Sequence, residues 1–210
     1  MQKSKKAQLI VSSLKEHYPE AHCALNYSNP FELLVATILS AQCTDERVNQ
    51  VTKDLFKKYT CPQDFALADL SCLEEDIRPT GFFRNKALSI QQTSQQLLVE
   101  HDGKVPNNLS QLIALRGVGR KTANVVMGNA FGKAEGVVVD THVSRLSQRL
   151  GLTQATHPEK IEQELMHLIP EVDWVLFPHL MISHGRAICK ARAPQCQSCF
   201  LAPICPSAQV

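Results

Sequence analysis

The stretch "NNLSQLIALRGVGRKTANVVMGNAF" (residues 107–131) divides into two apolar segments on either side of Gly117-Val118-Gly119. Apolar residues recur three and four positions apart in both segments, which predicts two short helices that pack against each other. These residues are Leu109, Leu112, Ile113, Ala123, Val126, Met127 and Ala130. Glycines also let a ligand approach the backbone closely. The stretch therefore predicts a helix–hairpin–helix whose second helix begins with N–H groups suited to an anion.

The spacing of the hairpin residues narrows the choice of anion. Arg120 separates Gly119 from Lys121, and no glycine lies five residues upstream of Gly119, so the stretch is not a Walker loop for ATP. A phosphate of a DNA backbone fits a short helix–hairpin–helix better. The candidate DNA-binding residues here are Gly117, Val118, Gly119, Arg120 and Thr122.

Lys121 is open to three interpretations: a surface charge, a further phosphate contact, or a nucleophile. A nucleophile must be the neutral amine, and both a helix N-terminus and the neighbouring Arg120 disfavour the protonated form. A carboxylate must then handle protons and positive charge nearby. Asp140, in "VVVDTHVSRLSQRL" (137–150), is the candidate carboxylate. Because Asp140 precedes an amphipathic segment, it is also a candidate helix N-cap.

Four of the eight cysteines form a cluster near the C-terminus. Cys189, Cys196, Cys199 and Cys205 are separated by six, two and five residues. Four thiolates in a loop without regular structure indicate a metal site, and a disulfide pair is the alternative. The spacing alone does not choose between zinc and a [4Fe-4S] cluster. Lys190 and Arg192 lie inside the first interval, either as a solvated turn or as phosphate contacts.

Helical periodicity dominates the rest of the chain, which predicts an all-α fold. "PFELLVATILSAQ" (30–42) is apolar on nearly all sides, as a central buried helix is. Residues 1–19 form an expected amphipathic helix with Leu9, Ile10, Ser13 and Leu14 on its apolar face. "GVVVD" (136–140) is too short and isolated to make a sheet. Further helices are expected at 108–115, 120–130, 142–150, 158–169 and 172–186.

Composition limits the class of protein without assigning it. The chain has 210 residues, is 44% hydrophobic and has a net charge of +2. The charge is uneven, with eleven Lys and Arg against seven Asp and Glu from residue 104 onward, the part that contains the hairpin. No run approaches the roughly 20 apolar residues that span a bilayer, and the N-terminus has no cleavage-site pattern. These features predict a soluble cytoplasmic protein without membrane partners.

Four motifs in order resemble the endonuclease III family of helix–hairpin–helix DNA glycosylase/AP lyases. They are "LSAQ-x-TD", "L-x-GVGRKTA", "VDTHV-x-R" and the C-x6-C-x2-C-x5-C tail, and they extend over nearly the whole chain. The resemblance implies a six-helix barrel domain at 23–134, with the helix–hairpin–helix at about 108–131. It implies a second, iron–sulfur domain formed by 1–22 together with 135–210. Four cysteines would then hold a [4Fe-4S] cluster.

The resemblance also implies an activity and a set of site residues. A bacterial-type, monomeric enzyme of base excision repair would remove oxidised pyrimidines from double-stranded DNA and cut 3′ to the abasic site by β-elimination. Lys121 would be the nucleophile, forming a Schiff base, and Asp140 the catalytic aspartate. Lys190 and Arg192 would contact DNA. Candidates for the lesion pocket or a wedge in the base stack are Gln42, Asp45, Phe82 and His142. Asp45 and His142 are alternatively helix-start polar groups, and Phe82 alternatively packs in the core.

Two residues depart from the family pattern. Arg116 stands where a proline is frequent, and Cys43 where alanine is commoner. Two other functions compete with the lyase. A monofunctional, adenine-specific glycosylase of the same superfamily needs a carboxylate in the helix at 31–42, which has only Glu32 at its start, and lacks the hairpin lysine. A non-catalytic DNA-binding or electron-transfer protein would not need both Lys121 and Asp140.

Overall fold

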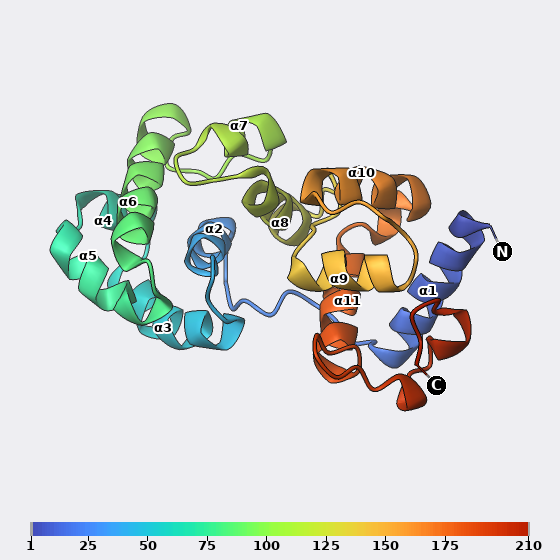
Figure 1. Ribbon diagram of the computed structural model, residues 1–210. Coiled ribbons are helices and arrows are strands. Elements are labelled where there is room, and N and C mark those ends of the chain that lie inside the picture. Colours follow the sequence, from blue (N-terminus) through green and yellow to red (C-terminus); the bar gives the residue numbers. More distant parts are fainter. Residues whose placement is uncertain (1, 210) are drawn as a thin grey trace. The chain divides into compact units, whose positions relative to one another are not determined.

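The computed structural model describes residues 2–209, in which all regular secondary structure is helical and no strand occurs (Figure 1). The chain forms two compact units. The central unit is Cys23–Lys133, and the terminal unit combines Met1–His22 with Ala134–Val210. The all-α fold predicted from helical periodicity is confirmed. "GVVVD" (136–140) makes no strand, in line with its short, solitary run. Between residues 2 and 209, no helix is long and apolar enough to cross a membrane.

The central unit is built from seven α-helices and one 3₁₀ turn. They are α2 (Pro30–Leu39), α3 (Asp45–Lys58), α4 (Pro62–Leu67), α5 (Leu70–Ile77), η1 (Arg78–Thr80), α6 (Phe83–Glu100), α7 (Leu109–Ala114) and α8 (Arg120–Phe131). Helix α2 contacts α3, α6 and α8. Its residues from Leu33 to Leu39 are all buried, as its uniformly apolar sequence predicts. The helices α4 and α5, of six and eight residues, were not among the helices expected from the sequence.

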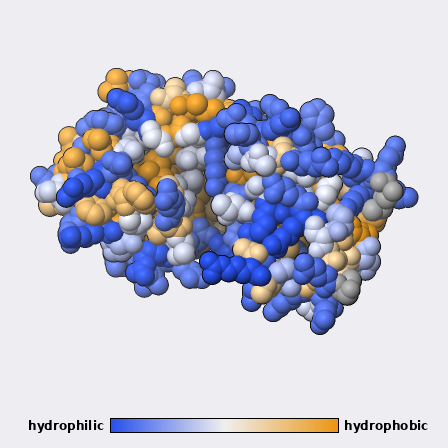
Figure 2. Space-filling model, in the orientation of Figure 1, coloured by the Kyte–Doolittle hydropathy of each residue, from blue (hydrophilic) through white to orange (hydrophobic). Residues whose placement is uncertain are grey.

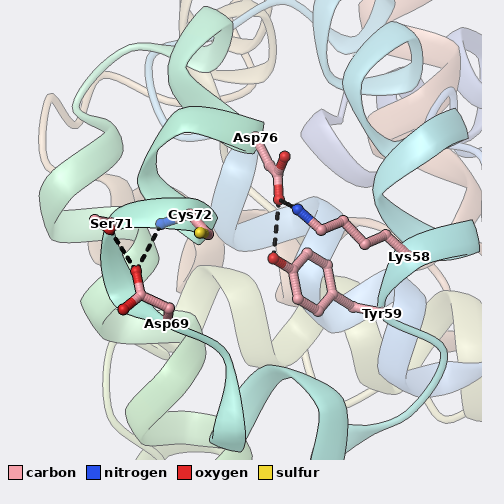
Figure 3. Close-up of polar contacts among 6 residues, drawn as sticks. All are labelled: Lys58, Tyr59, Asp69, Ser71, Cys72 and Asp76. Atoms are coloured by element: carbon pink, nitrogen blue, oxygen red, sulfur yellow. Dashed lines mark hydrogen bonds and ion pairs between the residues drawn. The ribbon is translucent and has the colours of Figure 1, made fainter.

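Polar side chains fix where the helices of this unit begin. Four N-caps accept a backbone N–H of the first turn, which satisfies a donor that has no partner within the helix. Asn29 caps α2, Thr44 caps α3, Asp69 caps α5 and Asn108 caps α7. In Figure 3, one carboxylate oxygen of Asp69 accepts from the Cys72 backbone at 3.0 Å and also bonds the Ser71 hydroxyl.

A second polar contact in Figure 3 joins the end of α3 to α5. Asp76 Oδ2 accepts from Lys58 Nζ at 2.6 Å and from the Tyr59 hydroxyl at 2.9 Å. Tyr59 is 7% exposed, and its ring packs against Phe65 at a centroid distance of 4.9 Å. Burial raises the pKa of Tyr59, with the Asp76 hydrogen bond acting in the same direction. This contact therefore holds α3, α4 and α5 together at one end.

The terminal unit has its own apolar core. Its elements are α1 (Lys3–His17), α9 (Thr141–Arg149), α10 (Pro158–Leu168), η2 (Glu171–Asp173), α11 (Leu176–Ala187), η3 (Cys196–Ser198) and η4 (Ala202–Ile204). Helix α1 contacts α10 and α11. Its buried face is Ala7, Ile10, Val11 and Leu14.

The expected apolar face of α1 is corrected in one respect. Leu9 was placed on it, but that side chain is 43% exposed. The stripe at positions i, i+3, i+4 and i+7 starts at Ala7, which turns Leu9 toward solvent.

The two units also differ in the hydropathy of their surface in Figure 2. Hydrophobic side chains show over α4 and α7, whereas the visible face over α9 and α10 is mainly hydrophilic.

Candidate functional site

The hairpin between α7 and α8 is held down by its apolar residues. Leu115 and Val118 are buried at 2% and 5% exposure, and the Val118 N–H bonds the Leu115 carbonyl at 3.2 Å. The predicted packing of α7 on α8 is observed through Leu112, Ala123, Val126 and Met127, all fully buried. Ile113 was expected on this face, but it is 40% exposed. Helix α7 has only six residues, and Leu112 is its one buried side chain.

Three residues along one face of α6 anchor the hairpin. Thr93 Oγ1 donates to the Arg116 carbonyl, and the Gln96 amide oxygen accepts from the Arg116 N–H at 3.1 Å. Gly117 has φ +71°, and a Cβ added to it would lie 2.7 Å from the Ser89 Cβ. Only glycine combines this backbone with such close packing. Arg116, whose presence in place of proline was unexplained, thus leaves a backbone N–H free to bond Gln96, a bond proline could not make.

Helix α8 begins directly after the hairpin, and Lys121 is its second residue. Its N-cap is Gly119, which has no side chain to bond the N–H groups of the first turn. Arg120 and Lys121 are both exposed. The helix end therefore presents positively polarised N–H groups beside two cations.

Asp140 is the N-cap of α9, in the terminal unit. Its Oδ1 accepts from the Val143 N–H at 2.8 Å, and the side chain is half-buried. The N-cap interpretation of Asp140 is therefore correct. The bond leaves the second carboxylate oxygen available for another partner, so a cap and a chemical role are compatible.

The four other pocket or wedge candidates lie at helix starts or in adjoining loops. Gln42 and Phe82 both have left-handed backbones, with φ +53° and +48°, and both are exposed. Phe82 is 62% exposed, so it does not pack in the core. Asp45 is the first residue of α3. His142 lies in the first turn of α9, with Nδ1 3.2 Å from Arg145 Nη2.

The four clustered cysteines line one cavity of about 320 Å³ in the terminal unit. All eight cysteines of the chain are free, so the disulfide alternative for the cluster is not observed. Within residues 2–209, no three or more His, Cys, Asp or Glu side chains converge closely enough to hold one metal ion. The thiols thus surround an open space rather than a single point.

Arginine and histidine side chains that the sequence analysis did not single out also contact this loop. Arg149 Nη1 donates to Cys189 Sγ at 3.3 Å and to the Lys190 carbonyl at 2.8 Å, and Nη2 donates to the Ala191 carbonyl at 2.8 Å. The sequence gives no signal for this role because Arg149 is 40 residues from Cys189 along the chain. Lys190 and Arg192 are exposed on the same loop.

His184 connects the loop to α1. Burial lowers the pKa of His184 to about 4, so the imidazole is neutral at neutral pH. Its Nδ1 lies 3.0 Å from the Tyr18 hydroxyl and its Nε2 3.5 Å from Cys199 Sγ. When Tyr18 donates to Nδ1, the only N–H of the ring points at the sulfur.

Comparison with known proteins defines the class of this fold and site. Residues 35–171 match the model of the HhH-GPD superfamily of base excision DNA repair proteins. The match covers α3 to α8 and continues through Asp140 and α9, so it includes both the hairpin and the capped carboxylate.

The full-length relatives are more specific. The chain is 56% identical to endonuclease III of Synechocystis sp. over 99% of this chain and 94% of that protein. It is 44% identical to endonuclease III of Bacillus subtilis over 98% and 94%, respectively. A structure of a trapped endonuclease III–DNA covalent intermediate superposes with a TM-score of 0.94 at 45% identity, covering 99% and 98% of the two chains. This chain belongs to the endonuclease III family, and it is accordingly a base excision repair DNA glycosylase with AP lyase activity.

Proposed function

We propose that this enzyme removes oxidised pyrimidines from double-stranded DNA and cleaves the strand 3′ to the abasic site through a Schiff base on Lys121. The observation that carries the proposal is the position of Lys121, exposed at the uncapped start of α8 and directly after the glycine hairpin. The trapped covalent DNA complex of a 45% identical protein supports a covalent mechanism.

Lys121 acts as the neutral amine. A base inside a duplex hides its sugar carbon, so the damaged nucleotide must first leave the stack. The amine lone pair then attacks C1′, and the bond from C1′ to the base breaks, with the base taking the electron pair and a proton. The C1′–O4′ bond of the sugar ring then opens, driven by the nitrogen lone pair, and O4′ takes up a proton, which leaves a Schiff base between Lys121 and C1′. This Schiff base acidifies the C2′ proton. Removal of that proton expels the 3′ phosphate, which breaks the strand.

Asp140 supplies the carboxylate for these reaction steps. Its cap bond to the Val143 N–H fixes one oxygen at the start of α9. The other oxygen stabilises the developing positive charge on the sugar and helps to move the protons. A carboxylate held by a helix end needs no reorganisation during the reaction.

DNA binding rests on the hairpin and the cysteine loop. The backbone N–H groups of Gly117 and Gly119, with Arg120 and Thr122, bind a phosphate, whereas the Val118 N–H donates to the Leu115 carbonyl and Val118 only shapes the hairpin. Lys190 and Arg192 contact the DNA backbone at a second place. Gln42 occupies the gap left by the extruded nucleotide, and Phe82 inserts into the stack as apolar side chains do in bent duplexes. Asp45 and His142 contribute to the lesion pocket.

The residues around the cysteine cavity fit a [4Fe-4S] cluster better than zinc. A zinc site needs four donors at about 2.3 Å from one point. A four-iron cluster is held by four thiolates that stand around it. An open cavity lined by Cys189, Cys196, Cys199 and Cys205, with cationic Arg149 on one sulfur, supports the second arrangement. When bound, the cluster would order the loop and take part in electron transfer.

Borohydride trapping tests the proposal, because borohydride reduces a Schiff base to a stable amine. A duplex with one thymine glycol is incubated with cluster-loaded protein and borohydride, and an undamaged duplex is the substrate control. We expect a covalent complex with the wild type and none with Lys121→Ala.

Lys133→Ala is the matched control variant. Lys133 is an exposed lysine two residues beyond the other end of α8, where its Nζ bonds the Asn107 carbonyl at 3.3 Å. This variant should form the covalent complex like the wild type. If cluster-loaded wild-type protein forms no covalent complex, the lyase mechanism is refuted. If the complex persists in Lys121→Ala, Lys121 is not the nucleophile.

A further inference from the structure

Lys86 is a buried cation in the central unit. It lies in the first turn of α6, only 5% of its surface is exposed, and none of the salt bridges found within residues 2–209 includes it. Burial lowers the pKa of Lys86. A buried lysine is rare unless its ammonium group is paired or bonded, so the contacts of this group call for an explanation.

The ammonium group bonds two helix ends at once. Lys86 Nζ donates to the Leu39 carbonyl and to the Thr80 carbonyl, each at 2.8 Å. Leu39 is the last residue of α2, and Thr80 is the last residue of η1. Terminal carbonyls lack partners within their helix and carry partial negative charge, which favours a cation. The Lys86 side chain therefore satisfies a carbonyl group at the C-terminal end of both α2 and η1.

Each of these helix ends leads into a strained loop. Gln42 follows Leu39 by three residues and Phe82 follows Thr80 by two, and both have positive φ. Only one other non-glycine residue among 2–209, Asp102, shares this conformation. Such backbones persist only where the surroundings fix them. The Lys86 backbone N–H also bonds the Phe82 carbonyl at 3.1 Å, so Lys86 holds the second loop on both sides of Gly81.

We propose that Lys86 is a positioning residue that clamps the loops of Gln42 and Phe82 into one rigid pair, which enters the DNA duplex together. The loop contacts are independent of DNA, whereas the role of the pair in DNA rests on the proposed function. Lys86 is itself buried and does not touch the substrate.

Hydrogen exchange without DNA tests the clamp directly. Lys86→Met keeps most of the apolar part of the side chain, one atom shorter, and removes its charge and its donors. The reporters are the amides that bond within the two loops, Ala41, Cys43 and Gly81. We expect exchange in peptides covering 40–44 and 79–83 to rise at least tenfold in Lys86→Met, with the hairpin 115–119 unchanged.

Leu97→Ala is the matched control. Leu97 is fully buried on the same helix but lies eleven positions from Lys86, and its loss should leave exchange of both loops at the wild-type rate. Should Lys86→Met fail to fold, Lys86→Gln replaces it, because the glutamine side chain is polar but uncharged and one atom shorter than that of lysine. Wild-type exchange in either loop of the folded variant would overturn the joint clamp.

A DNA measurement separates positioning from general loss of structure. The duplex has a tetrahydrofuran abasic analogue with 2-aminopurine opposite, whose fluorescence rises when it loses its stacking. Lys86→Met should bind this duplex about tenfold more weakly and lose the fluorescence rise. Its strand cleavage at saturating abasic DNA should stay within twofold of the wild type. Unchanged affinity and fluorescence would overturn the positioning role, whereas a wild type without fluorescence response would instead refute the proposed function of Gln42 and Phe82.

Discussion

Asp140 has an observed role as a helix cap and a proposed role in catalysis, and substitution can separate the two. Asp140→Ala removes both the cap on the Val143 N–H and the charge at the start of α9. Losing the cap costs about 1 kcal/mol, and losing a negative charge at a helix N-terminus adds roughly 0.3–1 kcal/mol. Asp140→Asn loses only the second contribution, because asparagine caps as well as aspartate.

The difference between the two variants therefore isolates the cap. It amounts to about 1 kcal/mol, which corresponds to roughly 2–4 °C in Tm for a chain of this size. Thermal unfolding followed by circular dichroism should place Asp140→Asn between the wild type and Asp140→Ala. Strand cleavage of abasic DNA should instead fall by about 10²–10⁴ in both variants, because both lack the carboxylate.

Asp69→Ala is the control for this pair. Asp69 caps α5 with the same geometry, accepting from the Cys72 N–H at 3.0 Å, and it has no proposed part in the chemistry. It should lower Tm and leave cleavage at the wild-type rate. Full activity in Asp140→Asn would refute the chemical role of the carboxylate, and equal Tm values for Asp140→Asn and Asp140→Ala would refute the capping argument.

Two further perturbations separate stability from binding in the hairpin and the cysteine loop. Gly117→Ala should lower Tm, because its Cβ meets Ser89 and its φ is positive, whereas a Cβ at Gly119 meets nothing within 4 Å. Gly119→Ala should keep the wild-type Tm within about 1–2 °C. It should weaken binding to abasic-analogue DNA, because its methyl group obstructs the approach of a phosphate. Wild-type affinity for this DNA would contradict phosphate binding by the hairpin. On exposure to air, the visible absorption of the cluster should decay faster in Arg149→Met than in the wild type. The decay rate of Arg149→Lys should lie between the two, because lysine keeps the charge but not the planar guanidinium group with its several donors. Identical decay in all three proteins would contradict the anchoring of the loop by Arg149.

Local pattern sufficed for most of the fold. The apolar residues of α8 recur at helical spacing, and those of α2 occupy nearly all sides, so the sequence predicted both helices. Helices α4 and α5 have six and eight residues, and their starts depend on Pro62 and Asp69 rather than on a repeat. The buried face of α1 shifted from Leu9 to Ala7 because alanine carries little apolar signal.

The site residues also form two groups, those that local motifs mark and those that only the fold brings together. Lys121, Asp140 and the four cysteines stand in local motifs, so the sequence alone marked them as candidates. Lys86, Arg149 and His184 bond partners 40 or more residues away, or lie in unremarkable helix interiors. Only the folded chain brings these partners together, so spacing could not reveal them.

Helix α6 carries contacts to both parts of the central unit that we propose to bind DNA. Lys86 holds the wedge loops, and Ser89, Thr93 and Gln96 follow at intervals of three and four residues along the helix to hold the hairpin. At 1.5 Å per residue the ten steps from Lys86 to Gln96 span about 15 Å. Under the proposed function, helix α6 therefore sets the distance between the loops that open the duplex and the hairpin that binds its backbone. One inserted residue between Lys86 and Thr93 would rotate the two sets of contacts apart by about 100°. We therefore expect the length of this segment to influence which distorted duplexes the enzyme accepts.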